Sequence, residues 1–138
     1  MLNDKINTCD LLTRKSFHLD CTNCVLCNDE GMEDKTHLLF SCPFSQGFWW
    51  SIGIEWNWDI RIYDMIIEAK QRYQLGFFME IMTVGCWSIW KQRNGLIFEG
   101  IPCSLTECRY DFIKTFELTM LRAKPSLKDG MSSWIDNI

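Results

Sequence analysis

Four residues in the first third of the sequence carry side chains that bind soft metal ions. Cys24 and Cys27 form a C-x2-C pair, His37 follows after nine residues, and Cys42 after four more. The two sulfurs of the first pair can converge on one ion, and an H-x4-C pair on a short helix or turn can complete a tetrahedron. Three thiolates and one imidazole form a closed Cys3His set, which is typical of structural Zn2+. The sequence therefore predicts one structural zinc ion per chain, bound by these four residues.

Two alternative ligands stand close to this set. Cys21 forms a second C-x2-C pair with Cys24, and His18 is the other histidine of the chain. We favour the pair that begins at Cys24. The two residues between its cysteines, Val25 and Leu26, are apolar, and a polar loop follows, which suits a zinc knuckle better. Buried, reduced cysteines are the competing interpretation, but the surrounding segment is too polar to form a core. We expect the remaining, scattered cysteines to be core residues or incidental thiols: Cys9, Cys86, Cys103 and Cys108.

The composition is that of one packed domain, since 47% of the 138 residues are hydrophobic and 23% are charged. The formal net charge of -4 argues against a general basic surface for nucleic acid. No secretory signal is visible at the N-terminus. The most apolar stretch, residues 75–90, contains Glu80 and is shorter than the about 20 residues of a membrane span. We therefore expect an intracellular protein, in the nucleus or cytoplasm, with reduced thiols and no membrane contact.

Hydrophobic periodicity and capping residues predict a mainly α fold. Short helices are expected from Asn7 or Thr8 to Arg14, from Asp34 or Thr36 to Phe40, and from Pro43 to about Ile52, with a loop over residues 17–35. Three longer helices are expected: 60–73 after an Asp59 cap, 75–94 before Gly95, and 105–124, which starts at a Ser104–Glu107 capping box and stops at Pro125. Beta propensity is confined to short pieces such as 96–98.

These elements suggest two parts. We predict a small Cys3His zinc-knuckle module over residues 1–57, followed by a helical extension of about three helices over residues 58–138. No linker of low complexity separates the parts, so the boundary rests on the change in residue character near 53–59.

A series of motifs runs through the first part: Ile6-Asn7-Thr8 leading into Leu11-Leu12, the Cys24-x2-Cys27 pair, the run from Glu33 to Phe44, and Trp49. The series resembles the zinc-binding domain at the C-terminal side of reverse transcriptases of plant non-LTR (LINE-type) retrotransposons. A second segment, Trp87 to Asn94 followed by Phe98, is similar to the region downstream of that domain. The resemblance covers about residues 5–50 and 83–100, and it implies zinc and a role beside nucleic acid.

The chain departs from this family in three ways. It lacks the apolar, tryptophan-containing lead-in before Asn7-Thr8, so we expect an N-terminally truncated domain. It has no two adjacent aspartates, which the metal site of a reverse transcriptase core would require, and no ribonuclease-H-like segment. We therefore expect a detached tail of a retroelement, or a host protein derived from one.

The sequence does not support catalysis. It contains two histidines, no Gly-rich phosphate loop and no G-x-S-x-G motif, and four protein ligands leave a zinc ion without an open position. We expect a retroelement-derived, non-catalytic zinc-binding protein with an accessory contact to RNA or DNA that is weak and sensitive to salt. The residues nominated for this contact are Lys91, Arg93, Trp56 and Trp58; for Arg93, covering a helix end or pairing with a carboxylate is the favoured role.

The alternative is a structural or protein-interaction module without nucleic-acid contact. The helix expected over 105–124 places Phe112, Ile113, Phe116 and Met120 on one stripe. Left uncovered, such a face would drive self-association, whereas ordinary packing within the chain would bury it. The tryptophans also have two interpretations, a stacking platform or core anchors. We favour core positions for Trp49, Trp50, Trp87 and Trp90, and we expect Trp56 and Trp58 to be the most exposed.

Overall fold

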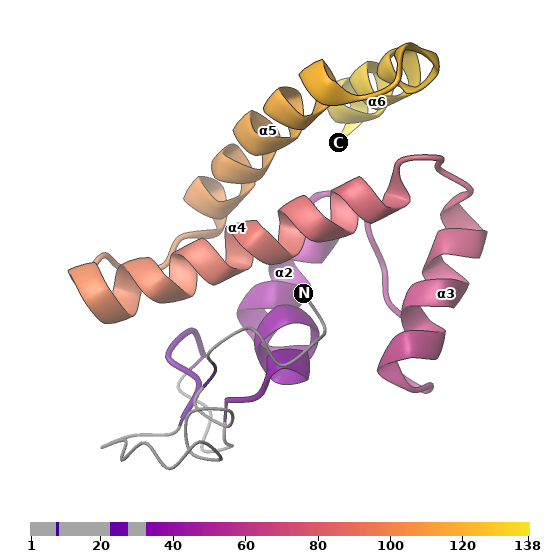
Figure 1. Ribbon diagram of the computed structural model, residues 1–138. Coiled ribbons are helices and arrows are strands. Elements are labelled where there is room, and N and C mark those ends of the chain that lie inside the picture. Colours follow the sequence, from indigo (N-terminus) through magenta and orange to yellow (C-terminus); the bar gives the residue numbers. More distant parts are fainter. Residues whose placement is uncertain (1–7, 9–22, 28–32) are drawn as a thin grey trace.

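A computed structural model describes residue 8 and residues 23–27 and 33–138 of the chain (Figure 1). The expected helix from Asn7 or Thr8 to Arg14 lies outside these residues apart from Thr8, and so do Cys9, His18 and Cys21. The described part is helical and contains no strand. Its elements are a one-turn π-helix η1 (His37–Ser41) and the α-helices α2 (Pro43–Ser51), α3 (Ile62–Tyr73), α4 (Phe78–Glu99), α5 (Leu105–Arg122) and α6 (Pro125–Asn137). The expectation of a mainly α fold is confirmed.

Helix α4 is the central element of the fold, because it contacts η1, α2, α3 and α5. Figure 1 shows α5 returning antiparallel to α4, with α6 folded back on α5 and α3 beside the N-terminal end of α4. α4 ends at Gly100, which adopts the left-handed conformation (φ 65°) and donates its backbone N–H to Gly95 O. The expected end at Gly95 is wrong, because the second glycine supplies the left-handed residue that closes the helix. The β-prone segment 96–98 is therefore helical.

Both ends of α5 are set by residues that the sequence singled out. Ser104 caps its N-terminus, where Ser104 Oγ accepts a hydrogen bond of 3.3 Å from the Glu107 backbone N–H. Pro125 follows the C-terminal end of α5, but it also occupies the first turn of α6, since proline suits a helix start as well as a stop. The extension beyond residue 58 accordingly has four helices, α3 to α6, and not about three.

Aromatic side chains join the N-terminal elements to the later helices. The Phe40 and Trp49 rings stack at 6.0 Å, and Phe48 of α2 meets Phe112 of α5 at 5.7 Å. Trp49 also lies against Gly85 of α4, where an added Cβ would come within 2.6 Å of Trp49 Cζ3. The close approach of α2 and α4 therefore depends on a glycine at this position. Phe112 and Phe116 are fully buried, and Ile113 and Met120 are partly buried and pack against the same core, so the expected self-association stripe packs within the chain.

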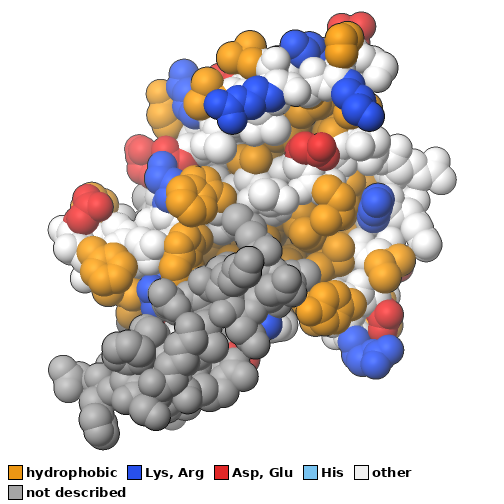
Figure 2. Space-filling view, in the orientation of Figure 1, with side chains coloured by type: hydrophobic (Ala, Val, Ile, Leu, Met, Phe, Trp, Pro, Cys, Tyr) orange, Lys and Arg blue, Asp and Glu red, His pale blue; other side chains and the backbone are white. Residues whose placement is uncertain are grey.

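The exposure of the tryptophans differs from the expectation at three positions. Trp56 is 7% exposed, although we expected it to be among the most exposed. Trp50 and Trp87 are 74% and 46% exposed, although we expected them in the core. Figure 2 shows hydrophobic side chains at the surface of the face that it displays, gathered between α4 and α3. No helix in the described part of the chain is both long and apolar enough to cross a membrane.

Candidate metal centre

The four nominated side chains come from two short segments that face each other. Cys24 and Cys27 lie on the described turn over 23–27, His37 opens η1, and Cys42 lies between η1 and α2. The second segment is fixed at its start by Asp34, whose Oδ1 accepts a hydrogen bond of 2.7 Å from the His37 backbone N–H. Asp34 was one of the two expected start residues of this turn. The spacing from His37 to Cys42 spans one turn of η1, from its first residue to the residue after it, and both side chains lie on the same side of that turn.

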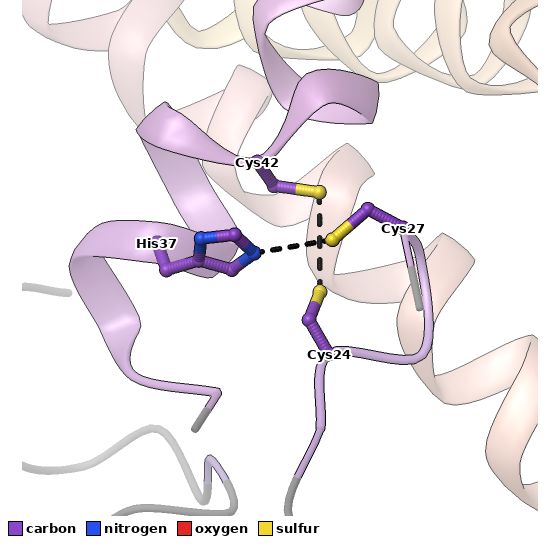
Figure 3. Close-up of side chains that lie close together, drawn as sticks. All are labelled: Cys24, Cys27, His37 and Cys42. Atoms are coloured by element: carbon purple, nitrogen blue, oxygen red, sulfur yellow. Dashed lines mark hydrogen bonds between the residues drawn. The ribbon is translucent and has the colours of Figure 1, made fainter. Parts of the chain in front are cut away.

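The ligand atoms of these residues converge on one point (Figure 3). Cys24 Sγ lies 3.9 Å from Cys42 Sγ, and Cys27 Sγ lies 3.3 Å from His37 Nε2. All four ligand atoms lie within 4.8 Å of one another. In the described part of the chain, this is the group of metal-binding side chains that comes together, and none of the other cysteines joins it.

The group fits a tetrahedral zinc ion. Zn–S bonds of about 2.3 Å and a Zn–N bond of about 2.0 Å place the ligand atoms about 3.5–3.8 Å apart. The two measured pairs lie close to these separations, and the widest pair needs to contract by about 1 Å. Three sulfurs and one imidazole nitrogen are also a donor set that favours zinc over hard cations. The residues present therefore fit the metal in number, in donor type and in spacing.

The two buried thiols influence each other's protonation. The hydrogen bond to Cys42, followed by burial, raises the pKa of Cys24. The same hydrogen bond lowers the pKa of Cys42, and the backbone amides of Phe44 and Ser45 at the start of α2 act in the same direction. The thiol at the helix start is thus the more readily ionised of the two. A bound divalent cation would replace the proton that Cys24 otherwise shares with Cys42.

The site is closed on its inner side. Cys24 and Cys42 are fully buried, whereas Cys27 and His37 are partly exposed. Beneath them lie the buried side chains of Leu38, Leu39 and Phe40. Ser45 further ties α2 to η1, because its hydroxyl donates a hydrogen bond to Leu38 O.

The remaining described cysteines have a different character. Cys86 and Cys108 are buried in the helical core, and burial raises the pKa of each thiol to about 12. They are therefore protonated at neutral pH and poor metal ligands. Cys103 is partly exposed between α4 and α5. The expectation that these three are core residues or incidental thiols is confirmed.

A buried ion pair connects this site to α4. Arg93 Nη2 lies 2.7 Å from Glu33 Oε1, and the Arg93 guanidinium also lies 4.9 Å from the centre of the Trp90 ring. The side chains of Arg93 and Glu33 are 4% and 0% exposed. Sequence reasoning expected a carboxylate partner for Arg93 but missed Glu33. No local signal in the sequence distinguishes Glu33 from the other acidic residues of the first 60 as the partner of Arg93.

The residues nominated for nucleic acid do not form one surface. Arg93 and Trp56 are buried, so neither side chain is available to a base or phosphate in this structure. Lys91 of α4 pairs with Asp111 of α5 at 3.1 Å. Trp58 is exposed, on the loop between α2 and α3. The nominations of Arg93 and Trp56 as contact residues are therefore corrected, because both side chains are buried.

Comparison with known families supports the metal site. Residues 1–49 match the model of the family described as zinc-binding in reverse transcriptase. The matched segment contains all four nominated ligands, and the resemblance expected over residues 5–50 is confirmed. No curated protein and no solved structure matches the chain. The similarity expected for residues 83–100 lies beyond the match and stays a prediction.

Proposed function

We propose that the N-terminal part of this chain is a structural zinc-binding module, with one Zn2+ per chain held by Cys24, Cys27, His37 and Cys42. The observation that carries this proposal is the convergence of the four ligand atoms within 4.8 Å, in a segment that matches a zinc-binding family. Zinc would supply a cross-link between the turn over 23–27 and the η1–α2 segment. Each side chain donates one atom, and the buried leucines beneath them exclude water from the inner side.

We further propose that the module has no catalytic activity. Four protein ligands complete a tetrahedral shell, whereas catalytic zinc keeps one position for water or substrate. The expected result of metal binding is therefore order in the polypeptide, because the free energy of binding adds to the free energy of folding. The family match also supports an origin from a retroelement, since the family is defined by its place in reverse transcriptase.

The test is the metal content of the full chain. Protein purified under reducing conditions, without a tag or added metal, should contain one zinc per chain by elemental analysis. Cobalt(II) substitution should give thiolate-to-metal charge-transfer bands and the intense visible bands of tetrahedral coordination. Cys27→Ser and His37→Ala should lower the zinc content and weaken cobalt binding. Cys103→Ser, which changes a thiol outside the group, is the matched control and should bind one zinc. Folded, reduced wild-type protein without stoichiometric zinc would contradict the proposal.

An accessory contact to nucleic acid is the second candidate. The family match favours it, because reverse transcriptase acts on nucleic acid, and Trp58 offers an exposed ring. The net charge of -4 limits the affinity. Titration of single-stranded RNA and DNA at two salt concentrations separates the candidates. Weak binding that falls steeply with salt supports the nucleic-acid role, whereas no binding at low salt leaves a structural or protein-interaction module.

A further inference from the structure

A groove lies between the outer face of α2 and the loop that joins α2 to α3. Its volume is about 530 Å³, and its lining includes Pro43, Trp49, Trp50, Ile54, Trp56 and Trp58. We call it the tryptophan groove. This volume falls in the range of about 300–1,000 Å³ that is usual for ligand sites. Neither the metal centre nor the nominated cations of α4 contribute to its described lining.

The four tryptophans divide into a floor and two walls. Trp49 and Trp56 are buried and belong to the core, so they form the floor. Trp50 and Trp58 are exposed, and they stand on the helix and on the loop respectively. Tryptophan is enriched among the few residues that dominate binding energies at protein interfaces. Two exposed indole rings beside one hollow therefore indicate a surface that is covered in a complex.

The loop side of the groove is held in place by α3. The backbone N–H of Glu55 donates a hydrogen bond of 2.8 Å to Tyr73 Oη. Arg72 Nη1 donates a hydrogen bond of 3.2 Å to Glu55 O. These two bonds fix the peptide groups next to Trp56, so the groove exists before a ligand arrives. A preformed site loses less conformational entropy on binding than a site that must be ordered.

The charge of the groove selects its ligand. Glu55 lines it with an exposed carboxylate that has no ion-pair partner among the described residues, and no lysine or arginine belongs to the described lining. Indole faces attract cations, and the carboxylate adds to this attraction. Phosphate groups would meet the negative charge of Glu55 and no lysine or arginine in the described lining, since the nearby Arg72 pairs with Glu68, although cations supply most of the affinity for nucleic acid. The groove therefore suits a cationic side chain and not a nucleic-acid backbone.

The shape and the floor favour a peptide as the carrier of that cation. Pro43 and Trp50 are seven positions apart on α2, which spans about 10 Å, the length of about three extended residues. Trp49 Nε1 donates to Leu39 O, but Trp56 Nε1 is buried without an acceptor among the described residues. We propose that the tryptophan groove binds an extended peptide segment that carries a lysine or arginine, with its cation over Trp50 or Trp58 and beside Glu55.

The experiment measures the indole N–H signals of the full chain by two-dimensional NMR under reducing conditions. The probe is an eight-residue Gly/Ser peptide with one central lysine, and matched peptides carry arginine, norleucine or glutamate at that position. The lysine and arginine peptides should shift the indole signals of Trp50 and Trp58. The norleucine and glutamate peptides should bind at least about three-fold more weakly, because they lack the cation–π attraction. A single-stranded oligonucleotide is titrated in parallel.

Four variants test the site without disturbing the core, since each changes an exposed side chain. Trp50→Ala and Trp58→Ala should each weaken binding of the lysine peptide at least about five-fold. Glu55→Lys should reverse the preference from the lysine peptide to the glutamate peptide. Trp87→Ala is the matched control, because it removes an exposed tryptophan on α4 outside the groove, and its affinity should equal that of the wild type.

Three results would overturn the proposal. One is the absence of any shift with the lysine and arginine peptides at millimolar concentration. Another is an equal response to the lysine and norleucine peptides. The third is a response of Trp50 and Trp58 to the oligonucleotide without a response to the lysine peptide, which would assign the groove to nucleic acid. None of these results depends on the zinc content, so the peptide proposal and the zinc proposal are tested separately.

Discussion

Glu33 and Arg93 are 60 positions apart in the sequence, yet their side chains form an ion pair of 2.7 Å that is almost fully removed from solvent. Glu33 leads into the segment that carries His37 and Cys42, and Arg93 belongs to the C-terminal half of α4. The two residues thus join the metal-binding segment to the helical extension by a contact of charged groups. Removing one partner takes away this ion pair while the other charge stays buried.

We expect Arg93→Met to lower the free energy of unfolding by about 3–5 kcal/mol, because it removes the ion pair of the buried Glu33 carboxylate. The double variant Glu33→Gln with Arg93→Met should be less damaging than the sum of the two single variants. Urea unfolding followed by circular dichroism measures the difference. Lys91→Met, which breaks the more exposed pair with Asp111 two residues away, is the control and should cost at most about 1 kcal/mol. Equal effects of Arg93→Met and Lys91→Met would contradict this account.

Removal of zinc should destabilise the N-terminal part while most of the helical signal remains. The metal centre lies in the residues up to Cys42, whereas α3 to α6 lie beyond residue 61. We expect a chelator to lower the thermal midpoint and to change the near-ultraviolet circular dichroism, because Trp49 stacks on Phe40 of η1. The far-ultraviolet signal should change little, and added zinc should restore the original state. A thermal midpoint that is the same before and after chelation would speak against a structural ion.

Stability should fall at high pH because of two core thiols. Burial raises the pKa of Cys86 and Cys108 to about 12, whereas an unfolded cysteine titrates near about 8.5. A pKa that is raised by folding stabilises the native state below the unfolded value, and this stabilisation is lost as the pH rises toward the folded value. Between pH 9 and 11 each thiol should lower the free energy of unfolding by up to about 1.4 kcal/mol per pH unit. Urea unfolding at several pH values should show a smaller slope for Cys86→Ala and Cys108→Ala; an unchanged slope would refute the role of the thiols.

Two glycines of α4 should respond to alanine in opposite ways. At Gly85 an added Cβ would collide with the Trp49 ring, so Gly85→Ala should destabilise the chain by about 1–3 kcal/mol. At Gly95 the nearest atom to an added Cβ is Ile101 Cβ at 3.9 Å, an ordinary contact. Gly95→Ala should therefore stabilise the chain by up to about 1 kcal/mol, the difference in helix propensity. Thermal unfolding of the two variants is the measurement. A loss of stability in both would show that helix propensity does not determine the effect of Gly95→Ala.

The metal centre was the most predictable feature of this chain. Its ligands lie in two short segments, and the spacing within each segment limits where the side chains can go. The cap at Ser104 was predictable for the same reason, since Ser104 and Glu107 interact within one helical turn. Local spacing therefore determined both features before any tertiary contact was known.

Features that depend on distant contacts were less predictable. Gly95 and Gly100 are both plausible ends for α4, and the choice falls on Gly100, the residue that adopts the left-handed conformation. Trp56 is buried because its ring packs edge-on against Trp49 and Phe40. Trp87 is exposed because its side of α4 is left uncovered. The pairing of Glu33 with Arg93 also requires the fold, because no local pattern selects one of nine acidic residues in the first 60.

Cys42 is both the last nominated ligand and the residue directly before α2. A bound ion at its sulfur would therefore set the angular phase of the whole helix. Adjacent residues on a helix point about 100° apart, and here Trp49 points to Gly85 while Trp50 points to solvent. One residue inserted between Cys42 and Trp49 would advance the following side chains by about 100°, so Trp49 would take the outward direction that Trp50 has now and Phe48 would take the place of Trp49. The ion would thus determine, through the orientation of one helix, which aromatic ring is buried and which is exposed.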